Sequence, residues 1–214
     1  VLLASLPVFI LAQSRTSLAG VFFAVLVFLI LNKQIKWIVV MCVVTGLLLV
    51  CSEFGTIMVD YLRKGENPEM IGTLTGRTVA WEYAWEMFKK SPILGYGFAS
   101  GARFDVLGGS SMIGLHGSIF DVLVNLGLVG TIPWLSAIIG TWIQLLFVFF
   151  KHSKRMLPRV RLVHTFMLSM VVLLTFRAVT ATALVMHDME FVLFLLLVGY
   201  AQMAMRSRGF VDSR

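Results

Sequence analysis

The stretch "GLVGTIPWLSAIIGTWIQLLFVFF", residues 127–150, runs for twenty-four positions without one charged side chain. A helix that crosses the hydrocarbon core of a bilayer needs about 20 mainly apolar residues. The composition of the chain agrees, because its 214 residues are 58% hydrophobic and only 14% charged, whereas about a quarter of the residues in a soluble domain are charged. With a mean hydropathy of +0.90, the sequence predicts an integral membrane protein.

Further apolar segments lie on both sides of this stretch. We predict spanning helices at 1–13, 17–31, 37–54, 162–184 and 189–205, in addition to 127–150. The first segment is too short to span alone and begins without a methionine, so we interpret it as a truncated helix of a longer protein. The predicted fold is an all-α, polytopic transmembrane bundle with one long, partly helical loop.

The chain divides into three regions on this basis. They are N-terminal, truncated transmembrane helices (1–54), a polar loop region (55–126), and C-terminal transmembrane helices with a tail (127–214). No repeat and no spacing typical of metal ligands is visible.

The charges orient these regions across the membrane. Two of the short loops and the tail hold ten basic residues and a single acid, Asp212; the basic residues are Lys33, Lys36, Lys151, Lys154, Arg155, Arg159, Arg161, Arg206, Arg208 and Arg214. By the positive-inside rule this set is cytoplasmic. The loop, with six basic and six acidic residues between positions 55 and 117, then faces the periplasm or the cell exterior. The net charge of +7 is explained by topology and does not require a nucleic acid as a partner.

Within the loop, residues 76–90 have the pattern of an amphipathic helix. Apolar residues recur at helical spacing, with Glu82, Glu86, Lys89 and Lys90 on the other side. Glu86 stands four residues before Lys90, a spacing that favours an ion pair on a helix. The residue before a proline avoids helical geometry, so Ser91-Pro92 should end the helix. Such a helix could lie along the outer membrane surface.

Three basic residues are expected at the outer membrane face. Arg15 lies at the outward-facing junction of the first two segments, Arg77 begins the amphipathic helix, and His116 lies where the loop returns to the membrane. A guanidinium matches the geometry of phosphate oxygens, and an imidazole can take a proton from a hydroxyl. Together they suit a phosphate-bearing lipid and an incoming hydroxyl. Alone, each has a plainer interpretation: an interfacial anchor, a solvated charge, or an ordinary polar residue before a helix.

Arg177 and three aromatic residues are further candidates. Arg177 is predicted about ten residues below the outer end of its segment, or roughly 15 Å deep at about 1.5 Å per residue. A charge within a membrane usually faces a cavity or a partner, so Arg177 either lines a polar cleft or belongs to a structural ion pair. Trp81, Trp85 and Tyr96 are candidates for stacking on a sugar; the tryptophans could equally be aromatic residues of the membrane interface.

Several motifs in combination resemble those of a known family. They are Ser14-Arg15-Thr16, Thr75-Gly76-Arg77 followed by Trp81, the run from Pro92 to Gly97, His116, and the run from Asp121 to Gly130. The set resembles the O-antigen ligase / O-antigen polymerase family of bacterial membrane glycosyltransferases, above all the branch that contains exopolysaccharide polymerases. The family usually has an asparagine where Gly117 stands.

This resemblance implies a multi-pass protein of the bacterial inner membrane with a large periplasmic loop. The implied enzyme is a metal-independent glycosyltransferase, without a cofactor. It moves a glycan from an undecaprenyl-diphosphate carrier to a hydroxyl of an acceptor glycan or lipid. By position, the catalytic residues would be Arg15 and Arg77, which bind the diphosphate, and His116, which assists the acceptor. Arg177, Trp81, Trp85 and Tyr96 would contact substrate.

Two other classes of function stay open at this stage. A transporter or flippase of a lipid-linked or anionic solute would show broken helices and a cavity reachable from the cytoplasm. A non-catalytic subunit of an envelope polysaccharide assembly would tolerate the loss of His116. The sequence also leaves open whether an enzyme of this kind polymerises repeat units or ligates finished chains.

Overall fold

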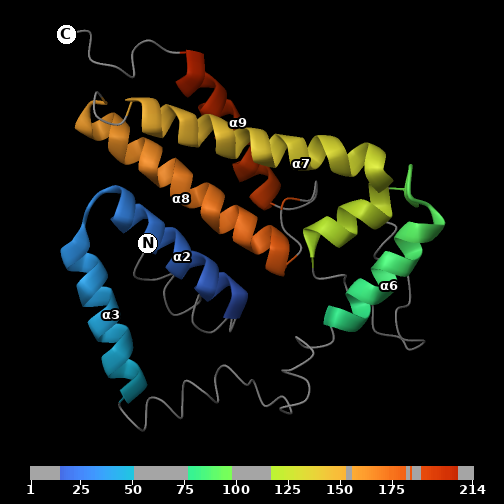
Figure 1. The fold of residues 1–214 in the computed structure, drawn as a ribbon, viewed down its shortest axis with the longest axis horizontal. Helices are drawn as coiled ribbons and strands as arrows, with labels where there is room; N and C mark the ends of the chain where they lie inside the picture. The colour runs from blue at the N-terminus through green and yellow to red at the C-terminus, as the bar shows by residue number, and fades with distance from the viewer. Residues whose placement is uncertain are drawn as a thin grey trace.

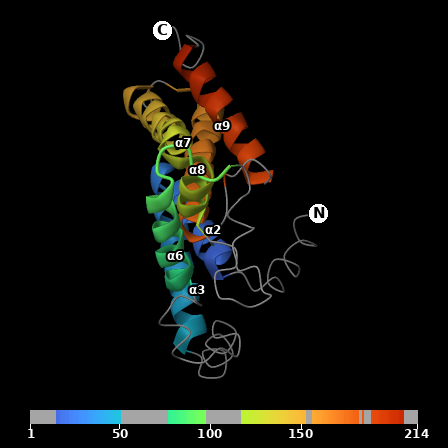
Figure 2. The ribbon, with the colours of Figure 1, turned by 90° about the vertical axis from the view of Figure 1, so that its right-hand side faces the viewer.

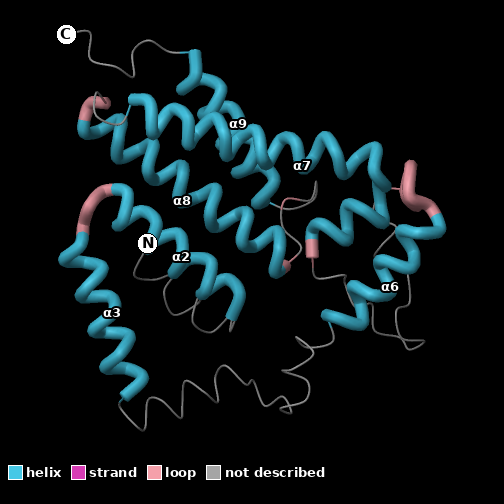
Figure 3. Tube along the Cα trace, viewed as in Figure 1, coloured by secondary structure: helices cyan, strands magenta, loops and turns pink. Residues whose placement is uncertain are grey.

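The computed structural model describes residues 15–50, 77–97, 117–152, 156–181, 184 and 189–206. Throughout these ranges the only regular secondary structure is helical (Figures 1 and 3). The helices are α2 (Arg15–Leu31), α3 (Ile35–Val50), α6 (Arg77–Lys90), α7 (Ser118–His152), α8 (Pro158–Thr180) and α9 (Met189–Arg206). Three of them, α7, α8 and α9, are long and apolar enough to cross a bilayer, and α2 and α3 are shorter apolar helices. The protein is therefore an all-helical, multi-pass membrane protein.

Helix α8 is the centre of the bundle, with α2, α7 and α9 packed around it (Figures 1 and 2). The main core is formed by buried aliphatic and aromatic side chains of α7, α8 and α9, among them Leu145, Leu168, Leu174, Phe194, Leu197 and Ala201. Small residues let membrane helices approach closely. At Gly20 of α2 an added Cβ would lie 3.0 Å from Leu173 of α8 and 3.2 Å from Phe176. Gly20 therefore lets α2 and α8 approach closely, and a larger residue there would require these two side chains to shift.

Polar contacts join the helices in the half of the bundle where α8 begins. The imidazole of His164 is fully buried between three helices, with Nε2 2.9 Å from the carbonyl oxygen of Leu145 and Nδ1 3.1 Å from the hydroxyl of Tyr200. A carbonyl can only accept, so Nε2 carries the proton and Nδ1 accepts from the tyrosine. His164 thus links α7, α8 and α9 by hydrogen bonds that leave neither ring nitrogen unpaired.

A second set of contacts joins the C-terminal end of α2 to α8. Arg161 donates through Nη2 to the carbonyl oxygen of Leu31 at 3.0 Å, and the amide of Asn32 donates to Thr165 at 3.0 Å. The last carbonyls of a helix lack partners within it and carry partial negative charge. A guanidinium from α8 therefore caps α2.

Helix α7 is interrupted near its start. Gly127 has a φ of 58° and a ψ of −160°, which is not helical, and the chain turns sharply there (Figure 1). The short part before Gly127 packs with α6, and the long part beyond it crosses the bundle. The predicted spanning segment 127–150 therefore begins at the break.

Backbone hydrogen bonds hold the loop of residues 91–97 against this break, and we call this pairing the clasp. Tyr96 and Gly97 donate to the carbonyl oxygens of Val124 and Asn125 at 2.9 and 2.8 Å. In the other direction, the amides of residues 128 and 129 donate to the carbonyl oxygens of residues 92 and 93 at 2.8 and 3.1 Å. The two backbones touch so closely that an added Cβ on Gly95 would lie 2.6 Å from backbone atoms of α7. Two glycine-bearing segments far apart in sequence thus form one structure.

Helix α6 covers the short part of α7. Its buried side chains, Ala84 and Met87, contact Val124 with Tyr83 and Phe120 packed around them. The charged face is exposed, as the sequence predicts, although Glu86 pairs with Lys89 at 2.6 Å and not with Lys90. Spacings of three and four residues both bring side chains together on a helix. The helix predicted at 76–90 is observed at Arg77–Lys90.

The other predicted boundaries agree within a few residues, with one shift of consequence. Helix α8 was predicted at 162–184 and lies at Pro158–Thr180, because Pro158 is suited to the first turn and Ala181 has extended backbone angles that end the helix. The segment predicted at 37–54 is observed as α3, Ile35–Val50. The segment 1–13 lies outside the described residues.

Candidate active site

Arg177 joins three helices at the end of the bundle where α2 and α9 begin. Its Nη1 donates to the hydroxyl of Ser17, near the start of α2, and its Nε lies 2.6 Å from Oε1 of Glu190, near the start of α9. The Nε contact is ionic and is not directed along a hydrogen bond. Both charged side chains are about a quarter exposed, at 26% and 23%. The ion pair foreseen as an alternative for Arg177 is present.

The depth predicted for Arg177 is wrong. Helix α8 ends at Thr180, so Arg177 lies in its last turn and not about ten residues below the end. The amide of Ala181 donates to the carbonyl oxygen of Arg177 at 2.7 Å and closes that turn. Leu184, the last residue of the segment predicted at 162–184, lies beyond the helix with a φ of 60°. Arg177 is therefore a residue at the end of the bundle.

A hydrogen bond connects this end of α8 to the start of α7. The hydroxyl of Ser118 donates to the carbonyl oxygen of Ala181 at 3.2 Å, one turn beyond Arg177. Ser118 is fully buried and stands two residues after His116. The segment where the loop returns to the membrane thus begins beside the end of α8.

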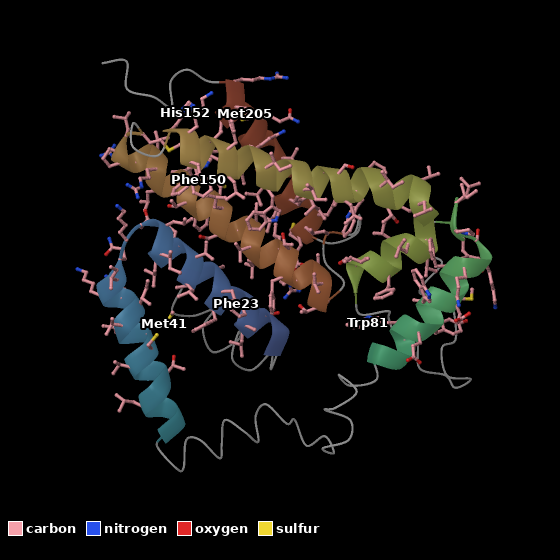
Figure 4. The ribbon with its side chains drawn as sticks, in the orientation of Figure 1. Phe23, Met41, Trp81, Phe150, His152 and Met205 are labelled. Atoms are coloured by element: carbon pink, nitrogen blue, oxygen red, sulfur yellow. The ribbon has the colours of Figure 1, made fainter. Side chains whose placement is uncertain are left out.

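Trp81 connects α6 to the same place. Its ring stacks on Phe120, with centroids 5.5 Å apart and planes 19° apart, and it lies between α6 and the start of α7 (Figure 4). An added Cβ on Gly117 would lie 3.2 Å from Nε1 of Trp81, tighter than most contacts in proteins. Gly117, which stands where the family usually has asparagine, leaves room for this indole. Arg77 stands one helical turn before Trp81.

The contacts therefore form a continuous path between four segments distant in sequence. It runs from Ser17 through Arg177 and Ala181 to Ser118, and from the adjacent Gly117 to Trp81. Arg15, His116 and Arg77 stand two, one and four residues from the nearest members of this path. Arg15 and Arg77 are the first residues of α2 and α6, whose starts lie at the same end of the bundle (Figures 1 and 2). The side chains of Arg15 and Arg77, and the whole of His116, lie outside the described part of the chain.

The remaining sequence candidates lie on the outer surface of α6 and the loop. Trp85 is 49% exposed and its ring is tilted over Phe88 at 5.3 Å between centroids. The hydroxyl of Tyr96 donates to the carbonyl oxygen of Met87 at 3.2 Å, near the end of α6. Trp85 therefore offers an open aromatic surface, whereas Tyr96 and Trp81 have packing roles as well.

The arrangement suits the binding of an anion. The first amides of a helix lack partners within it and favour negative charge, and α2 and α6 both begin here with an arginine. Arg177 adds a guanidinium held by Glu190. Among the residues described, no three of the types His, Cys, Asp and Glu come together as a metal site would require.

Sequence reasoning missed the residues that hold this path together. Ser17 and Ser118 follow Arg15 and His116 by two positions, and neither serine carries a signal that distinguishes it from any other. Glu190 did carry a signal in the sequence, since it is an acidic residue at the predicted outer end of a segment in a chain with few acidic residues. An acid there and an arginine near the neighbouring helix end indicate a pair once the helix ends are known.

Comparison with known proteins bears on the same segments. A family model described as O-antigen ligase matches residues 1–135, more than half of the chain. The chain belongs to the O-antigen ligase family. The match includes α2, α3, α6 and α7 as far as Leu135, and so contains the clasp and every candidate except Arg177. No curated protein and no solved structure matches the chain. As a member of the O-antigen ligase family, the protein is a multi-pass membrane protein of glycan processing and glycosyl transfer.

Proposed function

We propose that this protein transfers a glycan from an undecaprenyl-diphosphate carrier to an acceptor hydroxyl, on the side of the membrane where α6 lies. Membership of the O-antigen ligase family supports the reaction class. One structural observation carries the site: the path from Ser17 through Arg177, Ala181 and Ser118 to Gly117 and Trp81. This path supports the placement of Arg15, His116 and Arg77 around one junction, because each of the three stands within a few residues of a residue in the path.

In the proposed reaction the acceptor oxygen attacks the anomeric carbon of the donor sugar. A bond forms between that oxygen and that carbon, and the bond from the carbon to the diphosphate oxygen breaks. The proton of the acceptor hydroxyl goes to the imidazole of His116 as general base. The carrier diphosphate leaves with the electron pair. No oxidant and no further activation is needed, because the diphosphate is already a good leaving group.

Arg15 and Arg77 bind the diphosphate in this scheme, and Arg177 adds positive charge beside them. Negative charge grows on the leaving oxygen as the bond breaks, so donors fixed in advance around that oxygen lower the barrier. Positioning of the two substrates supplies much of the remaining acceleration. Trp85 is the aromatic residue best placed to stack on sugar, because it is exposed, while Trp81 is engaged with Phe120.

The proposed location is the bacterial inner membrane, with the region 55–126 in the periplasm. The support is the distribution of charge, because the ten basic residues of the short loops and the tail lie on the opposite side from α6 in the predicted topology. Exposed Lys151 at the end of α7 and exposed Arg159 at the start of α8 belong to this set.

A transport function has weaker support. Transporters built on broken helices bind their substrates near the middle of the bilayer. The break in α7 is at Gly127, twenty-five residues before the far end of the helix. The backbone on both sides of the break forms hydrogen bonds with the loop of residues 91–97. The break therefore serves the clasp at the outer end of the helix.

The test is complementation of a strain that lacks the protein, with analysis of its glycans. Arg77→Lys keeps the charge and loses the two-pronged contact, so it should retain part of the activity, while Arg77→Ala and His116→Ala should abolish it. Lys90→Ala is the matched control, because Lys90 is an exposed cation on the same helix, and it should be fully active. Short, unpolymerised units in the deletion strain would identify a polymerase, and long chains left on the carrier would identify a ligase. Normal glycans with His116→Ala and Arg77→Ala at normal protein levels would refute the proposal.

A further inference from the structure

Two large aliphatic side chains stand exposed on the loop that follows α6. Ile93 is 64% exposed and Leu94 is 72% exposed. Their backbone is not free to bury them, because the clasp fixes Pro92 and Ile93 to the amides of residues 128 and 129. The exposure of these two side chains is thus a fixed feature of the fold. It is favourable only if an apolar medium surrounds them.

The exposed pair adjoins a stripe of exposed apolar side chains on α7. On the long part of α7, exposed apolar residues recur at intervals of three, four or seven positions, at Val129, Ile132, Ile139, Ile143, Phe147 and Phe150. On a membrane-spanning helix such a stripe contacts the acyl chains. The amide of Val129, its first member, donates to the carbonyl oxygen of Ile93. Ile93 and Leu94 therefore adjoin the end of the stripe.

Helix length sets the depth of this end in the bilayer. The part of α7 from residue 128 to residue 152 has twenty-five residues, or about 37 Å at about 1.5 Å each. The hydrocarbon core is about 30 Å thick, with several ångströms of headgroup region on each side. With Lys151 at the opposite headgroups, the core ends about 20 residues earlier, near residue 131. Val129, and with it Ile93, then lies at the boundary between acyl chains and headgroups.

The neighbouring side chains have the chemistry of that boundary. Lys90 is exposed and stands at the end of α6, two residues before Pro92. Trp85 and Tyr96, both exposed, lie on α6 and on the same loop. Aromatic residues and lysines that reach toward phosphates are typical of membrane interfaces.

We propose that Ile93 and Leu94 form a membrane anchor that inserts into the lipid leaflet on the side of α6. The partner is the acyl-chain boundary of the bilayer. The anchor fixes the loop and the end of α6 at the membrane surface. Because the clasp bonds this loop to α7, the anchor also fixes the position of the break in α7. The inference rests on the fold and the span of α7 and does not require that the protein transfer glycans.

The test uses the full chain in proteoliposomes, with Cys42 and Cys51 replaced by alanine. A nitroxide is attached at Leu94→Cys, at Lys89→Cys as the water-exposed control on α6, and at Ile139→Cys as the lipid-exposed reference on α7. Collision rates with oxygen, which concentrates in lipid, and with a water-soluble nickel chelate report the surroundings of each label.

The anchor predicts that the label at 94 collides with the chelate several-fold less often than the label at 89, with an oxygen collision rate near that at 139. Equal accessibility at 94 and 89 would place the loop in water and overturn the proposal. Protection of position 94 from both reagents would show that protein covers the loop, which also overturns it. Equal helix content by circular dichroism in all three variants shows that each is folded.

Discussion

The clasp predicts that alanine at Gly95 is far more harmful than alanine at Gly97. Both glycines have positive φ, 66° and 100°, so either substitution costs roughly 1–2 kcal/mol of backbone strain. Only at Gly95 does the new Cβ collide, at 2.6 Å from the carbonyl carbon and oxygen of Asn125 and from the amide of Gly127. At Gly97 nothing lies within 4 Å. The pair therefore separates steric loss of the clasp from backbone strain.

The magnitude follows from the hydrogen bonds at stake. A Cβ at 2.6 Å from backbone cannot be relieved by a rotamer change, so the two segments must separate. Separation breaks the four hydrogen bonds between the loop and α7, each worth about 0.5–1.5 kcal/mol net. We expect Gly95→Ala to make opening of the clasp easier than Gly97→Ala by about 2–6 kcal/mol, or from about 30-fold to more than about 10,000-fold in the equilibrium constant.

Hydrogen–deuterium exchange of the purified protein, read by mass spectrometry, measures this directly. The informative amides are those of Tyr96, Gly97, Leu128 and Val129, which the clasp protects. Gly95→Ala should raise their exchange by the stated factor over Gly97→Ala, while the amides in the middle of α8 keep their protection. Equal exchange in the two variants would refute the steric argument and return both glycines to simple turn residues.

Three further predictions concern other parts of the fold. His164→Ala should lower the free energy of unfolding by about 2–4 kcal/mol and Tyr200→Phe by about 1 kcal/mol, with the double variant less destabilised than the sum because both remove one hydrogen bond; additive effects in denaturation would contradict that bond. Exchange of the charges by Arg177→Glu with Glu190→Arg should restore the stability that either single change loses, while activity stays low because a carboxylate repels diphosphate; restored activity would make Arg177 purely structural. A cysteine at the exposed position Glu86, in a background without other cysteines, should react with an impermeant thiol reagent on intact spheroplasts, and reaction only after lysis would invert the proposed topology.

Local pattern was enough to predict several elements. The charge-free run at 127–150 predicts a spanning helix because its side chains dissolve only in lipid, and α7 crosses the bundle from Gly127 onward. Ser91-Pro92 ends α6 where predicted, since the residue before a proline avoids helical geometry. The exposed charged face of α6 follows from the same helical period. These features depend on residues within one or two helical turns of one another.

The glycines of the clasp show where such reasoning ends. Gly95 and Gly127 were visible in sequence only as parts of two separate motifs. Both positions require glycine because the two backbones meet at van der Waals distance. No property of either segment alone predicts that they meet. In the same way, the depth of Arg177 was misjudged because the end of α8 is set by the extended backbone at Ala181, within an apolar run that could have continued as helix.

The sequence by itself determined that this is an all-helical membrane protein, which end of each helix carries the basic charge, and which residue types could bind a phosphate. Those properties depend on the chemistry of single side chains and on the spacing of apolar and charged residues within a segment. Only the tertiary structure decided that the starts of α2, α6, α7 and α9 and the end of α8 meet at one junction, through Ser17, Arg177, Glu190, Ser118 and Trp81. The physical reason is that each of these contacts joins segments separated by loops, and the length of a loop leaves the position of its ends in space undetermined.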